Sequence, residues 1–148
     1  MTLINEIKRL RAETGVSILE CKKALEETKG SFNRAKDVLR KWGRDLAEKK
    51  TKREVGFGIV DNYIHPDKRI GVIIELWCET DFVAKSDYFK NLAHEICLQI
   101  AAMNPNAHSL MFQPWIKDET KTIKDLIDEH IAKLGENITV KRFTRYEI

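Results

Sequence analysis

The most apolar run of the chain constrains its fold more than any other stretch. It reads Gly71, Val72, Ile73, Ile74, Glu75, Leu76, Trp77 and Cys78, and so short a run of β-branched and aromatic residues predicts a buried strand. The stretch from Val55 to Ile64 also has strand composition. Since the residues between these two stretches, from His65 to Arg69, predict a turn, the two strands are expected to pair as an antiparallel hairpin.

Two helical patterns and a third strand follow the hairpin. Ser86 is expected to cap a helix whose apolar residues recur every three or four positions until Asn104-Pro105. A last helix is expected from Asp118 to Leu134, after an irregular stretch, and the residues from Asn137 to Glu147 are expected to join the hairpin. Residues 55–148 therefore predict an α+β domain with a three-stranded antiparallel sheet packed with two helices.

The first 43 residues predict three short helices. Gly15 breaks the first helical pattern, Ser17 with Glu20 has the form of a capping box for the second, and Gly43 is expected to end the third. The spacing predicts a three-helix domain of ubiquitin-associated type over residues 1–43.

The residues from Arg44 to Glu54 are mostly charged and include no Gly or Pro. They predict a solvated, part-helical linker between two domains, 1–43 and 55–148. The basic run from Lys49 to Arg53 offers a contact for RNA, although such runs are usually solvated connectors.

The composition is that of a globular protein: of 148 residues, 43% are hydrophobic and 33% charged, with a net charge of +3. No apolar run approaches the roughly 20 residues of a membrane span, and the N-terminus has no pattern of a secretory signal. The three cysteines, which have no close pair, predict buried free thiols in a reducing compartment. The chain is therefore expected to be cytoplasmic, with no membrane partner.

No catalytic constellation stands out. There is no nucleophile with a paired histidine, and exposure on a strand or loop explains Glu75, Glu79 and Asp81. No spacing predicts a metal site or a cofactor. We expect a binding protein that is not an enzyme.

Two places carry apolar residues that a core does not explain. Phe82 lies on the connection between the buried strand and the next helix, so it either folds back under the sheet or is offered to a partner. Ile18 and Leu19 are adjacent and cannot both face one small core. Together with Val16, Ile18 either forms a hydrophobic staple at the helix entry or contacts a partner.

Four stretches resemble the elongation factor Ts family, in order and over nearly the whole chain. They are Thr14 to Leu25, Glu79 to Lys85, Gln113 to Asp118 and Ala132 to Phe143. The family usually has two methionines where this chain has Ile18 and Leu19. It also usually carries a longer helical insertion between the regions of Pro105 and Gln113, so the resemblance leaves homodimerisation open.

The resemblance implies a guanine nucleotide exchange factor that releases GDP from elongation factor Tu, a GTPase, during protein biosynthesis. It implies that Asp81 and Phe82 insert near the Mg²⁺ and nucleotide site, and that the turn before the second helix docks on the same partner. The implied partner-binding residues are Thr80, Asp81, Phe82, Val83, Val16, Ile18 and Leu19. No direct contact with nucleic acid is implied, and either a bacterium or an organelle genome is a possible source.

The residues leave alternatives open. One is a helical interaction module fused to an α+β domain. Another is a small RNA-binding protein that uses Lys49 to Arg53 and the stripe of Lys141, Arg142 and Arg145; it predicts a steep loss of affinity with salt. An aromatic stacking motif is absent, which counts against RNA. A small hydrolase ranks last, because no acid or thiol site is found.

Overall fold

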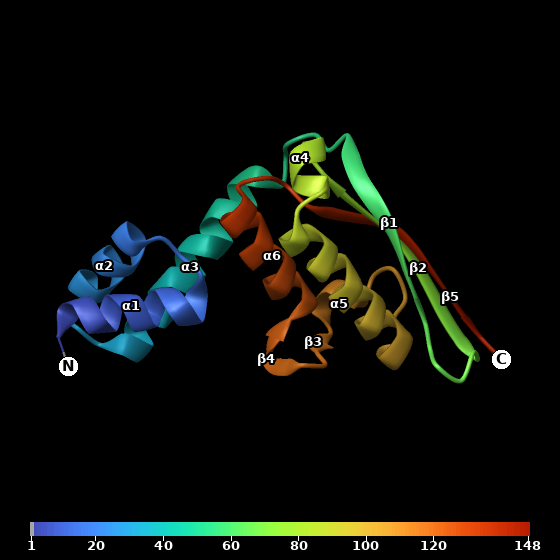
Figure 1. Cartoon of the computed structure of the whole chain (residues 1–148), viewed down its shortest axis with the longest axis horizontal. Helices are drawn as coiled ribbons and strands as arrows, with labels where there is room; N and C mark the ends of the chain where they lie inside the picture. Colours follow the sequence, from blue (N-terminus) through green and yellow to red (C-terminus); the bar gives the residue numbers. More distant parts are fainter. Residues whose placement is uncertain (1) are drawn as a thin grey trace.

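The computed structural model describes residues 2–148. Figure 1 shows an elongated molecule with a helical N-terminal part beside a part that contains sheet and helices. The elements in chain order are α1 (Leu3–Thr14), α2 (Ile18–Glu27), α3 (Phe32–Lys50), β1 (Phe57–Ile64), β2 (Ile70–Cys78), α4 (Asp81–Ala84), α5 (Asp87–Met103), the 3₁₀ turn η1 (Leu110–Phe112), β3 (Pro114–Trp115), β4 (Asp118–Thr122), α6 (Ile123–Leu134) and β5 (Thr139–Glu147).

The predicted three-stranded antiparallel sheet is confirmed. Its order is β1-β2-β5, with Ile64 opposite Gly71 and Ile70 opposite Glu147. Alternate residues of the central strand point to opposite faces, and Val72, Ile74, Leu76 and Cys78 are all buried on the inner face. The apolar run that led to the prediction is therefore the centre of the core.

Helices cover one face of this sheet. Helix α5 packs on β1 and β2, and α6 packs against α5 and, on its other side, against α3, as the layers in Figure 1 show. The opposite face carries exposed apolar residues, among them Val60, Ile73 and Tyr146. The fold is α+β, as predicted, and its core lies between the sheet and the helices.

The predicted start of the last helix is wrong. Residues Asp118–Thr122 form strand β4, which pairs with β3, and α6 begins at Ile123. Thr122 accepts a hydrogen bond from the backbone N–H of Asp125, and the Asp125 carboxylate accepts one from the N–H of Thr122. This reciprocal capping box fixes the start of α6 at Ile123, five residues after the expected start at Asp118.

The predicted end of the third helix is also wrong. Helix α3 continues through Gly43 to Lys50. Ala47 is buried in the main core cluster, and the Lys50 ammonium donates to the carbonyl of Gly135 at 2.7 Å. These tertiary contacts extend the helix, because they stabilise the helical conformation of residues for which the local sequence alone is not decisive. The domain boundaries at 43 and 54, and the likeness to ubiquitin-associated domains, stay predictions.

The N-terminal helices have a small core of their own. It consists of Ile7, Leu10, Cys21, Ala24, Leu25, Ala35 and Leu39. All three cysteines of the chain are free and buried, as predicted. Among residues 2–148, no helix combines the length and apolar character needed to cross a membrane.

Candidate functional site

The stretch after β2 forms a single helical turn, α4, where the sequence predicted only a connection. Thr80 is its N-cap: the hydroxyl accepts a hydrogen bond from the backbone N–H of Val83 at 3.3 Å. Asp81 occupies the first turn, where the helix dipole favours a negative charge.

Phe82 lies on the outer side of this turn and is 87% exposed, whereas Val83 and Ala84 are buried in the main core. The two buried residues anchor the turn, so Phe82 does not fold under the sheet. Full burial of such a side chain is worth roughly 1.5–3 kcal/mol, and that free energy is available only from a partner.

Asp81 is exposed beside Phe82 and forms an ion pair with Lys85 at 2.8 Å. The hydrogen bond and the charge of Asp81 raise the pKa of Lys85. Exposed pairs of this kind are weak. Asp81 can therefore exchange Lys85 for another cationic or hydrogen-bonding group without much loss.

The second apolar surface lies at the start of α2. Ile18 is 53% exposed and Leu19 61% exposed, while Val16 is half-buried against the small N-terminal core. Of these two adjacent residues, which were expected not to share one small core, neither is buried. With the helix beginning at Ile18, only Cys21, Ala24 and Leu25 face the core.

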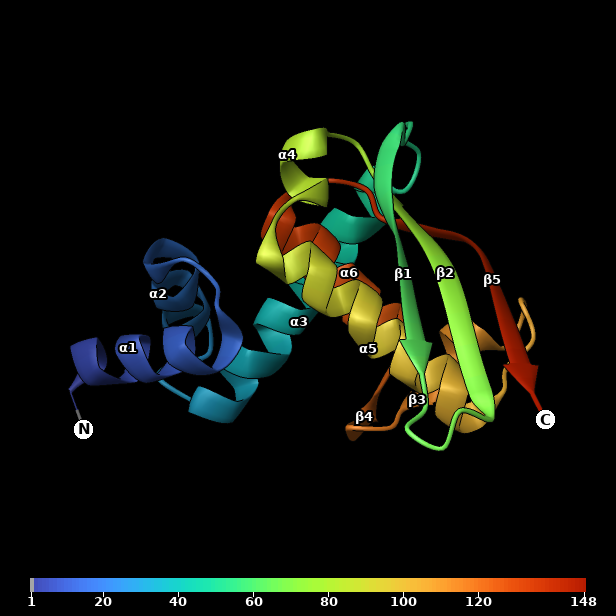
Figure 2. The ribbon, with the colours of Figure 1, turned by 45° about the vertical axis from the view of Figure 1, so that its right-hand side comes forward.

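These two surfaces are not contiguous. Figures 1 and 2 both show α2 and α4 on different parts of the molecule, on either side of α3. A partner that touches Phe82 and Leu19 at once must therefore be large enough to span the molecule. A protein domain meets that requirement, whereas a single small ligand cannot contact both surfaces.

The thiol beside the turn is a weak nucleophile at neutral pH. Burial raises the pKa of the Cys78 thiol to about 11, and this thiol donates to the carbonyl of Thr80. Within residues 2–148, no group of His, Cys, Asp or Glu is placed to hold a metal ion.

The basic stripe proposed for RNA is largely occupied within the chain. Arg142 pairs with Glu75, and Arg145 donates to the carbonyl of Ala101 and to Glu147. Only Lys141 of the three lies without a carboxylate partner among the ion pairs of the structure, over the ring of Trp77. The structure thus does not favour the RNA alternative.

One further residue at the site was not predicted from the sequence. Glu136, in the turn between α6 and β5, accepts hydrogen bonds from Glu79 and Thr80. It lies more than fifty residues away in sequence, so only the fold brings it to the turn.

Comparison with known proteins gives a consistent result. The family model described as "Elongation factor TS" matches residues 79–148. Proteins named "Elongation factor Ts" from Coprothermobacter proteolyticus, Thermodesulfovibrio yellowstonii and Thermotoga maritima are 40%, 41% and 42% identical to this chain. Each match covers 96% of this chain, and 95%, 94% and 94% of the respective relative.

The match also shows that this chain is the shorter one. The comparison with the Coprothermobacter proteolyticus protein extends over 188 positions, whereas this chain has 148 residues. At least 40 of those positions therefore have no counterpart here. This agrees with the expected shortening, and on the identity and coverage of these relatives the chain belongs to the elongation factor Ts family.

Proposed function

We propose that this chain is a translation elongation factor that acts as a guanine nucleotide exchange factor on elongation factor Tu. Membership of the elongation factor Ts family supports the role. The observation that carries it in this chain is the exposure of Phe82 on a turn whose next two residues are buried. An apolar side chain presented on an anchored turn is suited to insertion into a partner.

The proposed mechanism uses two contacts. The surface of Val16, Ile18 and Leu19 holds the nucleotide-binding domain of the GTPase, and the turn of Thr80, Asp81, Phe82 and Val83 acts near its Mg²⁺ site. Phe82 separates helices there, Asp81 holds the displaced segment, and Thr80 and Val83 set the shape of the turn. GTPases hold their nucleotide through a phosphate-binding loop and Mg²⁺, so displacing either lowers the barrier to release.

Such a factor needs no catalytic residues of its own. If the factor weakens GDP binding, GDP weakens binding of the factor by the same ratio, through a coupling free energy of typically about 1–3 kcal/mol. Binding of a new nucleotide then expels the factor. The chain thus accelerates exchange without changing the nucleotide chemically.

The test is the release of a fluorescent GDP from elongation factor Tu at fixed Mg²⁺, with and without this chain. We expect marked acceleration by the unaltered chain. We expect Phe82→Ala to reduce the maximal rate at least about tenfold, the equivalent of roughly 1.4 kcal/mol of lost barrier lowering. Its free energy of unfolding should change little, because the ring is exposed.

Phe112→Ala is the matched control. Phe112 is another strongly exposed phenylalanine, on η1, away from both surfaces. This variant should release GDP as fast as the unaltered chain. No acceleration by the folded chain would contradict the proposal, and equal losses in the two variants would remove Phe82 from the mechanism.

A further inference from the structure

We propose that Glu136 is a positioning residue for the turn that carries Asp81 and Phe82, and that its carboxylate sets how the turn is presented to the partner. The inference rests on the proposed function, since it assigns a role in the same exchange reaction. Glu136 follows Thr80 by 56 residues in sequence, and it belongs to neither hydrophobic cluster.

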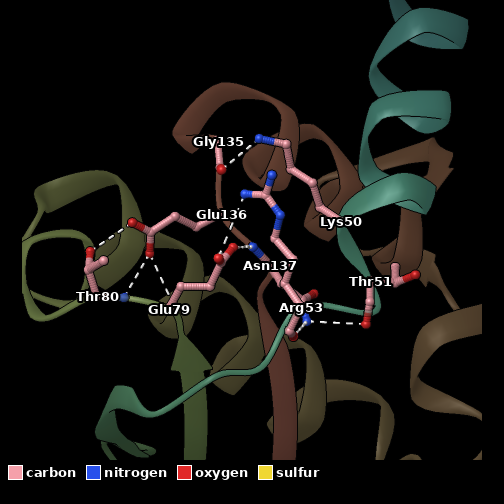
Figure 3. Close-up of polar contacts among 8 residues, drawn as sticks. All are labelled: Lys50, Thr51, Arg53, Glu79, Thr80, Gly135, Glu136 and Asn137. Atoms are coloured by element: carbon pink, nitrogen blue, oxygen red, sulfur yellow. Dashed lines mark hydrogen bonds and ion pairs between the residues drawn. The ribbon is translucent and has the colours of Figure 1, made fainter.

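The Glu136 carboxylate uses both oxygens on one short segment. Oε1 accepts from the backbone N–H of Glu79 at 3.1 Å and of Thr80 at 2.9 Å, and Oε2 accepts from the Thr80 hydroxyl at 2.7 Å. Figure 3 shows the three bonds converging on this one side chain. Hydrogen bonds to an ionised carboxylate are about twice as strong as neutral ones, so the entry to α4 is fixed at three points.

The Thr80 hydroxyl transmits this constraint to the helix. It donates to Glu136 and accepts from the N–H of Val83. A hydroxyl has one proton, and directing it to the carboxylate leaves its lone pairs for the cap. A helix of four residues is far too short to be stable by itself, so the orientation of Phe82 depends on this cap and on the burial of Val83 and Ala84.

The residue after Glu136 extends the network to α3. The backbone N–H of Asn137 donates to the Glu79 carboxylate, and its side chain donates to the carbonyls of Thr51 and Arg53. Asn137 is only 4% exposed, and Arg53 forms an ion pair with Glu79 at 3.7 Å. Figure 3 shows these contacts side by side with those of Glu136.

The turn between α6 and β5 therefore contacts both the Phe82 turn and the end of α3. Through Glu136 it fixes the turn that carries Phe82, and through Asn137 and the carbonyl of Gly135 it fixes the end of α3. Helix α3 leads back to the N-terminal helices with the second apolar surface.

The experiment compares Glu136→Ala and Glu136→Gln with the unaltered chain. Alanine removes all three hydrogen bonds. Glutamine retains a carbonyl oxygen for the two backbone N–H groups, so it should restore most of the function. Glu129→Ala is the matched control, because it removes a carboxylate of α6 that forms an ion pair with Lys121.

Two readouts are measured. The first is amide hydrogen exchange of the free chain at Glu79, Thr80 and Val83, where Glu136→Ala should reduce protection by about tenfold, the usual size for losing charged hydrogen bonds. The second is GDP release against factor concentration. Glu136→Ala should lower the maximal rate at least about fivefold with a half-saturating concentration within about twofold, because the Ile18 and Leu19 surface is intact.

The outcomes separate the two proposals. Unchanged protection in Glu136→Ala, or reduced protection with unchanged GDP release, would overturn the positioning role. If the unaltered chain does not accelerate GDP release from elongation factor Tu, the proposed function is overturned. The hydrogen-exchange comparison would still decide whether Glu136 holds the turn. If Glu136→Ala does not fold, Thr80→Val removes the hydroxyl hydrogen bond to Glu136 together with the cap to Val83, and Thr80→Ser keeps both.

Discussion

At the scale of single residues, the three cysteines show how burial controls chemistry. Burial raises the pKa of Cys97 to about 12 and that of Cys78 to about 11, and it also raises the pKa of Cys21. The thiolate is the reactive form, so at neutral pH Cys97 and Cys78 should be alkylated at least about 100-fold more slowly than a free thiol. Mass spectrometry after iodoacetamide treatment should show three labels only on the unfolded chain. Rapid labelling of native Cys78 would mean that the turn beside it opens often.

At the scale of elements, Gly43 gives a stabilising substitution. It lies inside α3, where glycine costs roughly 0.5–1 kcal/mol relative to alanine. A Cβ there would meet only the Cβ of Ala132, at an ordinary 3.6 Å. Gly43→Ala should therefore raise the free energy of unfolding in urea by about 0.5–1 kcal/mol.

Gly15→Ala is the contrasting variant for this helix test. Gly15 has φ +70°, and its Cβ would lie 2.9 Å from the ammonium of Lys133. We expect a loss of about 1 kcal/mol, from the left-handed backbone. A similar loss at Gly43 would show that α3 breaks there after all.

Glycines at helix ends also show how far the sequence predicts these elements. Gly15 ends α1 in the left-handed conformation, and the sequence predicted a break of the helix there. Gly43 also follows an apolar pattern, yet α3 continues through it. The burial of Ala47 in the main core stabilises the continued helix, and the local sequence does not predict that tertiary contact. The exposed Phe82 was foreseeable as one of two options. Its support by Glu136 was not, since that contact exists only in the folded chain.

At the scale of the whole molecule, α3 joins the two hydrophobic clusters. Its first half buries Ala35 and Leu39 in the N-terminal core, and its second half buries Ala47 in the main core. Figure 2 shows the helix running from one part to the other. A single helix shared by both cores couples them, so we expect the two proposed partner surfaces to keep a set separation.

This coupling is tested by placing a charge on either side of the second half of α3. Ala47 is 1% exposed, and Ala47→Asp would bury a carboxylate for which the apolar cluster offers no partner, so we expect a loss of about 3 kcal/mol or more in the free energy of unfolding. Leu46→Asp, at a side chain that is 37% exposed, should cost much less.

Urea unfolding followed by tryptophan fluorescence measures both variants, since Trp42 packs on the N-terminal core and Trp115 on the main core. If α3 couples the two cores, Ala47→Asp should destabilise both of them. The charge displaces α3 from the main core, and the same helix supplies Ala35 and Leu39 to the N-terminal core. A solvated linker would instead tolerate both substitutions equally. Were that the result, the separation between the Phe82 turn and the Ile18–Leu19 surface would be free to vary, and a partner that engages both would have to supply the order that we assign here to α3.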